Sequence, residues 1–221
     1  MMAHEKRERS MGFSTWYEDK ILPHIIRCGC ANANIAALRA KIVPLAEGRV
    51  FEMGVGGGLN QPFYETSKIT GFSGIDPSEK LLDYARAAAR SRGWDTDIRQ
   101  GFGEAIPFSD AEFDTVVCTF TMCSVQDQAR VLDEMRRILK PGGRLLFLEH
   151  GRAVDPVVVK WQTRIEPAWK RVFGNCHLSR AVTGAVRESG FAMEYTDHTY
   201  MSGAPRFAGF MEWGVGIKAG H

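Results

Sequence analysis

Short apolar runs alternate with amphipathic stretches through most of this chain. Four runs have the length and near-continuous apolar character of strands buried on both faces of a sheet: residues 49–53, 69–75, 113–120 and 144–149. Residues 96–100 form a shorter strand candidate. Helical spacing is seen over residues 78–92 and 126–139, and Pro141-Gly142-Gly143 is expected to end the second helix. Strands that alternate with helices predict a doubly wound α/β fold with a parallel sheet.

The two ends of the chain add further elements. Residues 15–28, with a break at Pro23, and residues 32–43 are expected to be helical, so that residues 1–48 form a helical N-terminal cap. Beyond residue 150 we expect helices at 157–172 and 179–189, the second with Ser179 as its N-cap, and strands at 193–199 and 207–217. The short connection between the last two strands favours antiparallel pairing. We expect a single domain over residues 1–221.

Composition limits the classes of function. The 221 residues are 44% hydrophobic and 24% charged, with 28 basic and 26 acidic side chains, which argues against disorder. A net charge of +2 gives no reason to expect a nucleic acid or an anionic membrane as partner. The sequence shows neither a secretory signal nor an apolar run of about 18 residues, so we expect no transmembrane segment and a cytoplasmic location.

The cysteines indicate reduced thiols. Five cysteines are present, unevenly spaced, which does not suit a disulfide framework. Cys28-Gly29-Cys30 has the spacing of a partial metal motif, but no second pair follows at the spacing of a zinc site. The sequence therefore predicts no metal.

Glycine is enriched at one turn. Four of the 23 glycines, Gly54, Gly56, Gly57 and Gly58, fall within five residues after the first expected strand, where glycine lets the backbone approach a ligand closely. The spacing is G-x-G-x-G, and Leu59 stands where a dinucleotide-binding turn has its third glycine. Glu52 would repel a pyrophosphate, so it favours a ligand with a cationic amino group. The turn alone would also fit an NAD enzyme or a purely structural role.

Asp76 ends the second expected strand. An acidic group there can accept both hydrogen bonds from a ribose diol. A nucleoside that carries an amino-acid tail would satisfy both Asp76 and Glu52, and S-adenosylmethionine (SAM) is such a ligand. The distance from Gly58 to Asp76 is that of one strand-helix-strand step.

Together these segments resemble the class I SAM-dependent methyltransferases. The resemblance is carried by residues 52–58, Asp76, residues 101–108, residues 113–124 and residues 139–143. It implies a Rossmann-like, seven-stranded, mostly parallel sheet with an antiparallel last strand, and S-adenosylhomocysteine as product. It also implies that residues 49–149 form the cofactor half and residues 150–221 the substrate side and the C-terminal strands.

The same resemblance implies a set of cofactor contacts. These are Tyr17, Glu52, Gly54, Gly56, Gly58, Asp76, Pro77, Phe102, Gly103, Glu104 and Thr119. Many relatives carry an aspartate at the place of Phe102, where it accepts a hydrogen bond from the adenine amino group. Phenylalanine cannot accept that bond, so stacking or a backbone carbonyl must replace it here.

A narrower resemblance extends beyond the cofactor half, to the methyltransferase-like protein 7 group of alkyl thiol S-methyltransferases. It is carried by residues 117–126, Glu149-His150, Trp161-Gln162, residues 166–170 and residues 175–180. It implies a small acceptor, methylated on the sulfur of a thiol or sulfide. Phospholipid N-methyltransferases and quinone C-methyltransferases share the cofactor half, so an amine of a lipid headgroup or a quinone-like carbon remains an alternative. A non-catalytic SAM-binding module is a third.

The acceptor side offers three candidate catalytic residues. His150 follows the fifth strand at the edge where ligands bind, and His177 and Arg180 precede the next expected helix. A neutral histidine or a cationic field would raise the thiolate fraction of an acceptor. Alternatively, His150 would form a hydrogen bond with a loop carbonyl, and Arg180 would form a surface salt bridge. Trp161 and Trp169 would belong either to an apolar lid or to the core.

Overall fold

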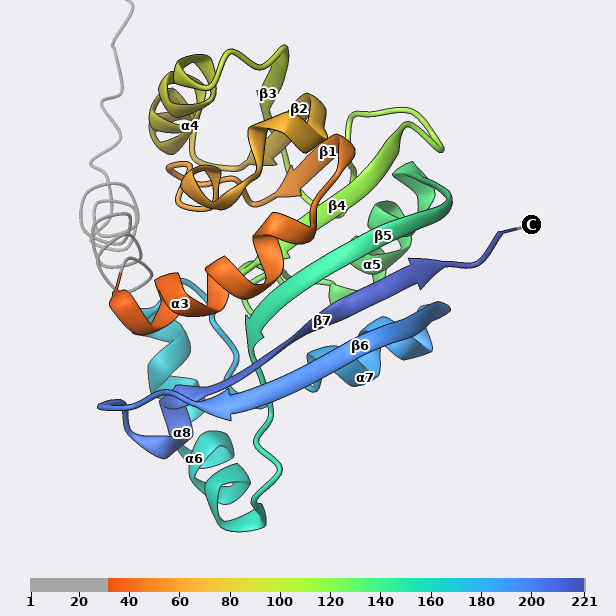
Figure 1. Cartoon of the computed structure of the whole chain (residues 1–221). Coiled ribbons are helices and arrows are strands. Elements are labelled where there is room, and N and C mark those ends of the chain that lie inside the picture. Colours follow the sequence, from red (N-terminus) through yellow and green to blue (C-terminus); the bar gives the residue numbers. More distant parts are fainter. Residues whose placement is uncertain (1–31, 221) are drawn as a thin grey trace, which may run out of the picture.

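A seven-stranded sheet runs through the molecule in the order β3-β2-β1-β4-β5-β7-β6 (Figure 1). The structure is a computed structural model, and it describes residues 32–220. The strands are β1 (Gly48–Met53), β2 (Ile69–Asp76), β3 (Thr96–Gln100), β4 (Phe113–Thr119), β5 (Leu139–His150), β6 (Phe191–Tyr200) and β7 (Phe210–Lys218). β7 is antiparallel to both of its neighbours, and the remaining pairs are parallel. The expected Rossmann-like sheet with an antiparallel last strand is confirmed.

Helices cover both faces of this sheet. They are α3 (Ala33–Ile42), α4 (Glu79–Ser91), α5 (Gln128–Ile138), α6 (Pro156–Val172), α7 (Val182–Glu188) and α8 (Arg206–Gly209), with short 3-10 turns at Val43–Leu45, Gln61–Phe63 and Thr66–Lys68. Side chains of α3 and α4 share one buried cluster with the sheet, and side chains of α5 and α7 share the other. The expected helix over residues 15–28 lies outside the described residues, as do Tyr17, Cys28 and Cys30.

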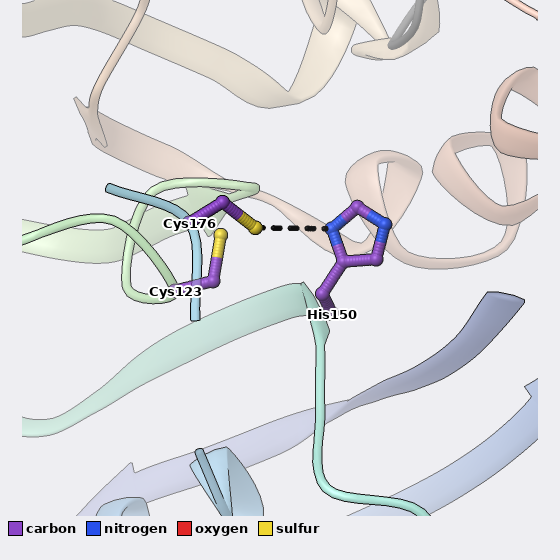
Figure 2. A group of neighbouring side chains, drawn as sticks. All are labelled: Cys123, His150 and Cys176. Atoms are coloured by element: carbon purple, nitrogen blue, oxygen red, sulfur yellow. Dashed lines mark hydrogen bonds between the residues drawn. The ribbon is translucent and has the colours of Figure 1, made fainter. Parts of the chain in front are cut away.

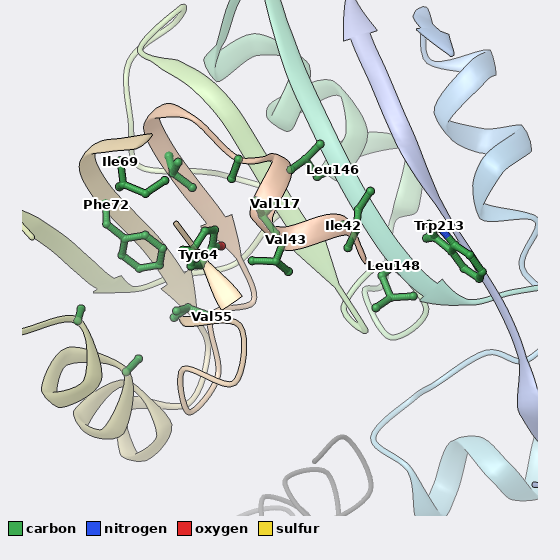
Figure 3. Packing of buried hydrophobic residues seen from close by; sticks show 14 of the residues in the cluster. Ile42, Val43, Val55, Tyr64, Ile69, Phe72, Val117, Leu146, Leu148 and Trp213 are labelled. Carbon is green, nitrogen blue, oxygen red and sulfur yellow. The ribbon is translucent and has the colours of Figure 1, made fainter. Parts of the chain in front are cut away.

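The core follows from the apolar runs in the sequence. Successive residues of one strand point to opposite faces, so Val116 packs with the α5 and α7 cluster and Val117 with the α3 and α4 cluster. Figure 3 shows the cluster that contains side chains of α3 and α4, in which Ile42 at the end of α3 lies over Leu146 and Leu148 of β5. Burial on both faces explains why these runs are apolar at every position rather than at alternate ones.

Three expected boundaries were wrong. α5 ends at Ile138, before the Pro141-Gly142-Gly143 turn, because Leu139 already pairs with Phe113 in an extended conformation. β5 therefore begins five residues before the expected position 144, and the turn lies within it. The last strand begins at Phe210 rather than at 207, since residues 206–209 form the short helix α8.

Ser179 is not the N-cap of the next helix. α7 begins at Val182, and the cap position is Ala181, which has no side-chain acceptor. The carboxylate of Glu212, on β7, accepts hydrogen bonds from the backbone amides of Val182 and Thr183 instead. Ser179 donates both its amide and its hydroxyl to Glu166. A cap supplied by a distant strand leaves no local sequence pattern.

The parallel strands bring their carboxyl ends to one edge of the sheet. Met53, Asp76, Thr119 and His150, the last residues of four of these strands, all lie there. Over residues 32–220, none of the helices combines the length and the apolar character that crossing a membrane requires.

Candidate active site

The glycine turn folds back over the end of β2. The amides of Gly54 and Val55 both donate to the carbonyl of Ile75, at 2.9 and 3.0 Å. Gly54, Gly56 and Gly58 have φ values of +70°, +50° and +80°, which glycine adopts without strain. A Cβ at Gly54 would collide with the side chain of Thr121, whereas one at Gly56 would meet no atom closer than 3.9 Å. The turn is thus packed at its start and open at Gly56.

Asp76 lies beside the open part of the turn. One carboxylate oxygen accepts the Gly56 amide at 3.0 Å and the other accepts the Ser78 amide at 2.9 Å. Burial raises the pKa of this carboxyl, and the two backbone hydrogen bonds oppose the shift. Each oxygen keeps a second lone pair. The position and the remaining acceptor lone pairs fit the two hydroxyls of a ribose.

Glu52 lies in a closed polar network. Its two oxygens accept from Asn60 Nδ2 and from the Tyr64 hydroxyl, both at 2.8 Å. Burial raises the pKa of Glu52 to about 7, against the effect of those hydrogen bonds and of Arg39. Glu52 is 1% exposed, so its carboxylate is enclosed by these partners.

Thr119 belongs to the same network. Its hydroxyl accepts from Arg39 Nη1 at 2.9 Å and from Asn60 Nδ2 at 3.0 Å, and Arg39 also donates to the Asn60 side-chain oxygen. Sequence reasoning missed Arg39, Asn60 and Tyr64. They stand in no motif, and only the folded chain brings them to Glu52.

The loop after β3 presents Phe102. This side chain is 65% exposed, as a stacking surface would have to be. Gly103 packs against Met53 and Val131, with no room for a Cβ. Glu104 accepts the backbone amides of residues 126 and 127 with one oxygen, ahead of α5. The Pro77 carbonyl accepts from Gln100 at 2.9 Å.

Glu149 holds the loop that follows β4. It is fully buried and accepts the amides of Thr121, Met122 and Cys123, at 2.9, 3.0 and 3.2 Å. Burial raises its pKa to about 7, and the three backbone bonds oppose the shift. In the sequence, Glu149 was noted only as part of the Glu149-His150 pair, and nothing there indicated that it binds the loop after β4.

His150 faces two cysteines (Figure 2). Its Nδ1 lies 3.9 Å from the sulfur of Cys176, and the Cys123 sulfur belongs to the same group. Contact with Cys123, and then with His150, lowers the pKa of Cys176, whereas the contact with Cys176 raises that of Cys123. The ring of Phe120 meets the imidazole edge-on at 5.5 Å.

His177 and Arg180 fasten the chain between α6 and α7 to the loop after β4. The amide of His177 donates to the Cys123 carbonyl at 2.8 Å, and its Nδ1 lies 3.2 Å from a Glu166 oxygen. Arg180 donates to the carbonyls of Met122 and Val125, at 2.6 and 2.7 Å. The Arg180 guanidinium is therefore engaged with backbone carbonyls rather than with a surface carboxylate.

The aromatic residues of α6 divide between two environments. Trp161 is 54% exposed, whereas Trp169 stacks on Phe173 with ring centres 4.0 Å apart. Trp169 also meets Phe207 of α8 edge-on, at 6.3 Å. The stripe is therefore partly packed and partly open, rather than wholly core.

Part of the chain matches a known family. Residues 51–147 match the family described as a methyltransferase domain. The match covers 97 of the 221 residues and includes the glycine turn and Asp76. A SAM-dependent methyltransferase from Thermotoga maritima has the same fold, with a TM-score of 0.64 and 24% identity, over 90% of this chain and 97% of that one.

Two curated relatives are similar in sequence. Thiol S-methyltransferase TMT1B of Rattus norvegicus is 36% identical over 149 residues, which are 65% of this chain and 59% of that protein. Phosphatidylethanolamine N-methyltransferase of Cereibacter sphaeroides is 37% identical over 105 residues, 47% of this chain and 51% of that protein. The chain thus spans about three fifths of the length of the first relative and about half of the second.

Proposed function

We propose that this chain transfers a methyl group from SAM to the sulfur of a small thiol or sulfide. The main support for this proposal is the length of the alignment with the thiol S-methyltransferase. It covers 149 residues, more than the 97 residues from 51 to 147 that the domain family covers. The phospholipid methyltransferase match, over 105 residues, is little longer than that domain. The likeness to the thiol enzyme therefore includes residues outside the cofactor half.

The cofactor supplies an electrophilic methyl carbon on a sulfonium, whose bond to that carbon breaks with its electron pair left on the cofactor's sulfur. Asp76 would hold the ribose diol through its free lone pairs, and Phe102 would cover the adenine. The remaining cofactor residues of this proposal are Tyr17, Glu52, Gly54, Gly56, Gly58, Pro77, Gly103, Glu104 and Thr119. Of these, Glu52 and Thr119 would act through the buried network with Arg39 and Asn60, which supports the turn from below.

The acceptor would enter beside His150 and Phe120. His150 ends β5, and Phe120 directly follows the neighbouring strand β4 at the carboxyl edge. The Phe120 ring would give one apolar wall. His177 and Arg180 would be positioning residues, because both bond to the loop that carries Cys123. Burial, and then Arg180, lower the pKa of His177, so its imidazole is neutral at pH 7. Alignment of acceptor and methyl group in such a site can contribute about 7–11 kcal/mol.

Replacement of Asp76 tests the cofactor site. Asp76→Ala should weaken SAM binding about 10- to 100-fold, since hydrogen bonds to a charged group contribute about 1.5–3 kcal/mol. Calorimetric titration of SAM measures the change. Asp95→Ala, at an exposed position at the end of the α4–β3 connection, is the control and should bind SAM normally. Unchanged affinity in Asp76→Ala would contradict the ribose contact.

A panel of acceptors tests the transfer itself. Incubation with SAM and with sulfide, methanethiol or longer alkyl thiols should give the methylated sulfur product, detected by mass spectrometry. No methylation of any of them would refute the thiol acceptor. The phospholipid alternative, which the second relative supports, predicts that the chain floats with anionic liposomes and methylates their ethanolamine headgroups.

A further inference from the structure

Two cysteines and one histidine converge at the carboxyl edge of the sheet. We name Cys123, His150 and Cys176 the Cys2His cluster. Their sulfur and ring nitrogen atoms all lie within 4.8 Å of one another, and Figure 2 shows the three side chains directed to a common point. They come from three separate segments: the loop after β4, the end of β5 and the connection from α6 to α7. Nothing in the transfer described above uses the two thiols.

The spacing is slightly wider than that of the ligands of one zinc ion. Zinc bonds sulfur at about 2.3 Å and imidazole nitrogen at about 2.0–2.1 Å, so tetrahedral angles place its ligand atoms about 3.5–3.8 Å apart. The distance from Cys176 Sγ to His150 Nδ1 is 3.9 Å. Small rotations of the side chains would bring all three atoms to one ion.

The backbone around the cluster is fixed. Glu149 accepts the Cys123 amide at 3.2 Å, and the Cys123 carbonyl accepts the His177 amide at 2.8 Å. The side chain of Asn175 donates to the Ser124 carbonyl at 2.9 Å. The two segments that carry the cysteines are therefore bonded to each other on both sides of the thiols.

One flanking residue holds a costly conformation. Phe120 has a φ value of +55°, and the left-handed region costs a bulky residue about 1–2 kcal/mol. Asn175, at +63°, is of a type that adopts this region more readily. Phe120 lies against His150, and Asn175 precedes Cys176. Backbone strain of this kind gathers at functional sites. Its place here agrees with a ligand-binding role for the cluster.

The cluster is incomplete as a structural zinc site. Structural sites have four protein ligands, whereas catalytic sites have three and keep one position open. Within residues 32–220, no fourth histidine, cysteine or acidic side chain joins the group. The thiols are buried, at 2% and 6% exposure, and the histidine is half-buried. A bound ion would therefore have its open position on the histidine side.

We propose that the Cys2His cluster binds one Zn²⁺ ion and that the acceptor thiol takes the fourth position. This proposal rests on the proposed function for its second half, and it departs from the expectation of no metal. The acceptor's S–H bond breaks, its electron pair forms the zinc–sulfur bond, its proton goes to solvent, and the water bound to zinc leaves. A thiol that coordinates zinc is deprotonated outright. After methylation the sulfur is a neutral thioether, which binds zinc weakly and gives way to water.

The place in the fold suits this function. β4 lies between β1, which leads into the glycine turn, and β5, which ends at His150. Adjacent strands are about 4.8 Å apart, so the turn and the cluster are separated by about 10 Å along the edge. An extended cofactor seated on the turn can bridge that distance toward the cluster.

Metal content tests the first half of the proposal. The full chain is purified under reducing conditions, stripped with a chelator, dialysed against Zn²⁺ alone and then against buffer, and its zinc measured by mass spectrometry. We expect one zinc per chain, and loss of that zinc in Cys123→Ser, Cys176→Ser and His150→Ala. The exposed-histidine control His198→Ala should keep it. No bound zinc in the folded wild-type chain, or zinc kept by all three cluster variants, would overturn the site. So would a Cys123–Cys176 disulfide that persists in reductant.

Cobalt tests the second half without any turnover. Co²⁺ in the cluster should give sulfur-to-metal charge-transfer absorption, and an alkyl thiol added without SAM should change that spectrum while the matched alcohol should not. An unchanged spectrum would overturn thiol coordination. Failure of the proposed function gives a different result: zinc and thiol bind as expected, but no methyl group is transferred when SAM is present. Each half can therefore fail separately.

Discussion

Buried carboxylates organise the backbone around this site. Asp76 joins the glycine turn to the start of α4, and Glu149 collects three amides of the loop after β4. Glu52 binds two side chains and is nearly fully buried. A carboxylate that accepts hydrogen bonds from several N–H or O–H groups can fix the conformation of a loop with a single side chain. The burial that makes these bonds strong also raises the pKa of each group.

The pKa of Glu52 predicts a pH dependence of stability. The folded value of about 7 lies above the ordinary 4.5, so the folded state holds the proton more tightly than the unfolded state. The contribution of Glu52 to stability is therefore fully present below pH 4.5 and is lost as the pH rises to about 7. Between pH 5 and 8 we expect wild type to lose about 2–3 kcal/mol more than Glu52→Gln, which cannot ionise.

Urea unfolding at several pH values measures this difference. The glutamine keeps the shape of the side chain and can still accept from Asn60. Glu188→Gln, at an exposed position on α7, is the matched control and should follow wild type. Parallel curves for wild type and Glu52→Gln would contradict the raised pKa.

At the level of elements, the turn after β1 depends on contacts that the sequence does not reveal. Gly54 and Gly142 have similar φ values, +70° and +76°. Around Gly142 there is open space, whereas a Cβ at Gly54 would collide with Thr121 in the loop after β4. The two positions therefore separate the cost of the backbone conformation from the cost of close packing.

Alanine at these two glycines should have unequal effects. Gly142→Ala should lower the free energy of unfolding by about 1–2 kcal/mol, the cost of the left-handed conformation alone. Gly54→Ala adds overpacking, commonly about 1–3 kcal/mol, and should also weaken SAM binding because the turn must move. Unfolding in urea and calorimetric titration measure the two quantities. Equal destabilisation with unchanged SAM affinity would refute the proposed packing of the turn on Thr121.

The inner strands β1, β2, β4 and β5 were predictable because burial on both faces leaves long apolar runs. Residues 96–100 and the glycine turn were also placed correctly, although residues 96–100 are only partly buried. The predicted boundaries were wrong where residues distant in the sequence determine them. Glu212 on β7 caps α7, and Leu139, directly after α5, pairs with Phe113 in the sheet. The Cys2His cluster joins residues 26 or more positions apart, so no spacing rule could have found it.

At the level of the whole molecule, the two edges of the sheet differ. The carboxyl edge holds the glycine turn, Asp76 and the loop with Phe102. The opposite edge is closed by ion pairs such as that between Lys140 and Asp114, at 2.6 Å. The proposed ligand contacts all lie at the first edge, where doubly wound sheets bind their ligands.

Hydrogen exchange should map this asymmetry. S-adenosylhomocysteine should slow amide exchange in residues 54–60, 76–78 and 101–104, because a bound nucleoside excludes water and stabilises those loops. Residues 140–143 at the opposite edge should show no direct protection beyond the general stabilisation. Mass spectrometry of peptic fragments measures both. Protection centred on residues 140–143 would contradict the assigned binding edge.

The central claim concerns the acceptor atom, and a competition assay tests it most directly. The chain is incubated with SAM labelled in its methyl group and with equal amounts of hexanethiol and hexylamine, which differ only in the reacting group. The account predicts that the label is recovered on sulfur, as methyl hexyl sulfide. Label recovered on nitrogen, or on neither while SAM remains bound, would contradict it.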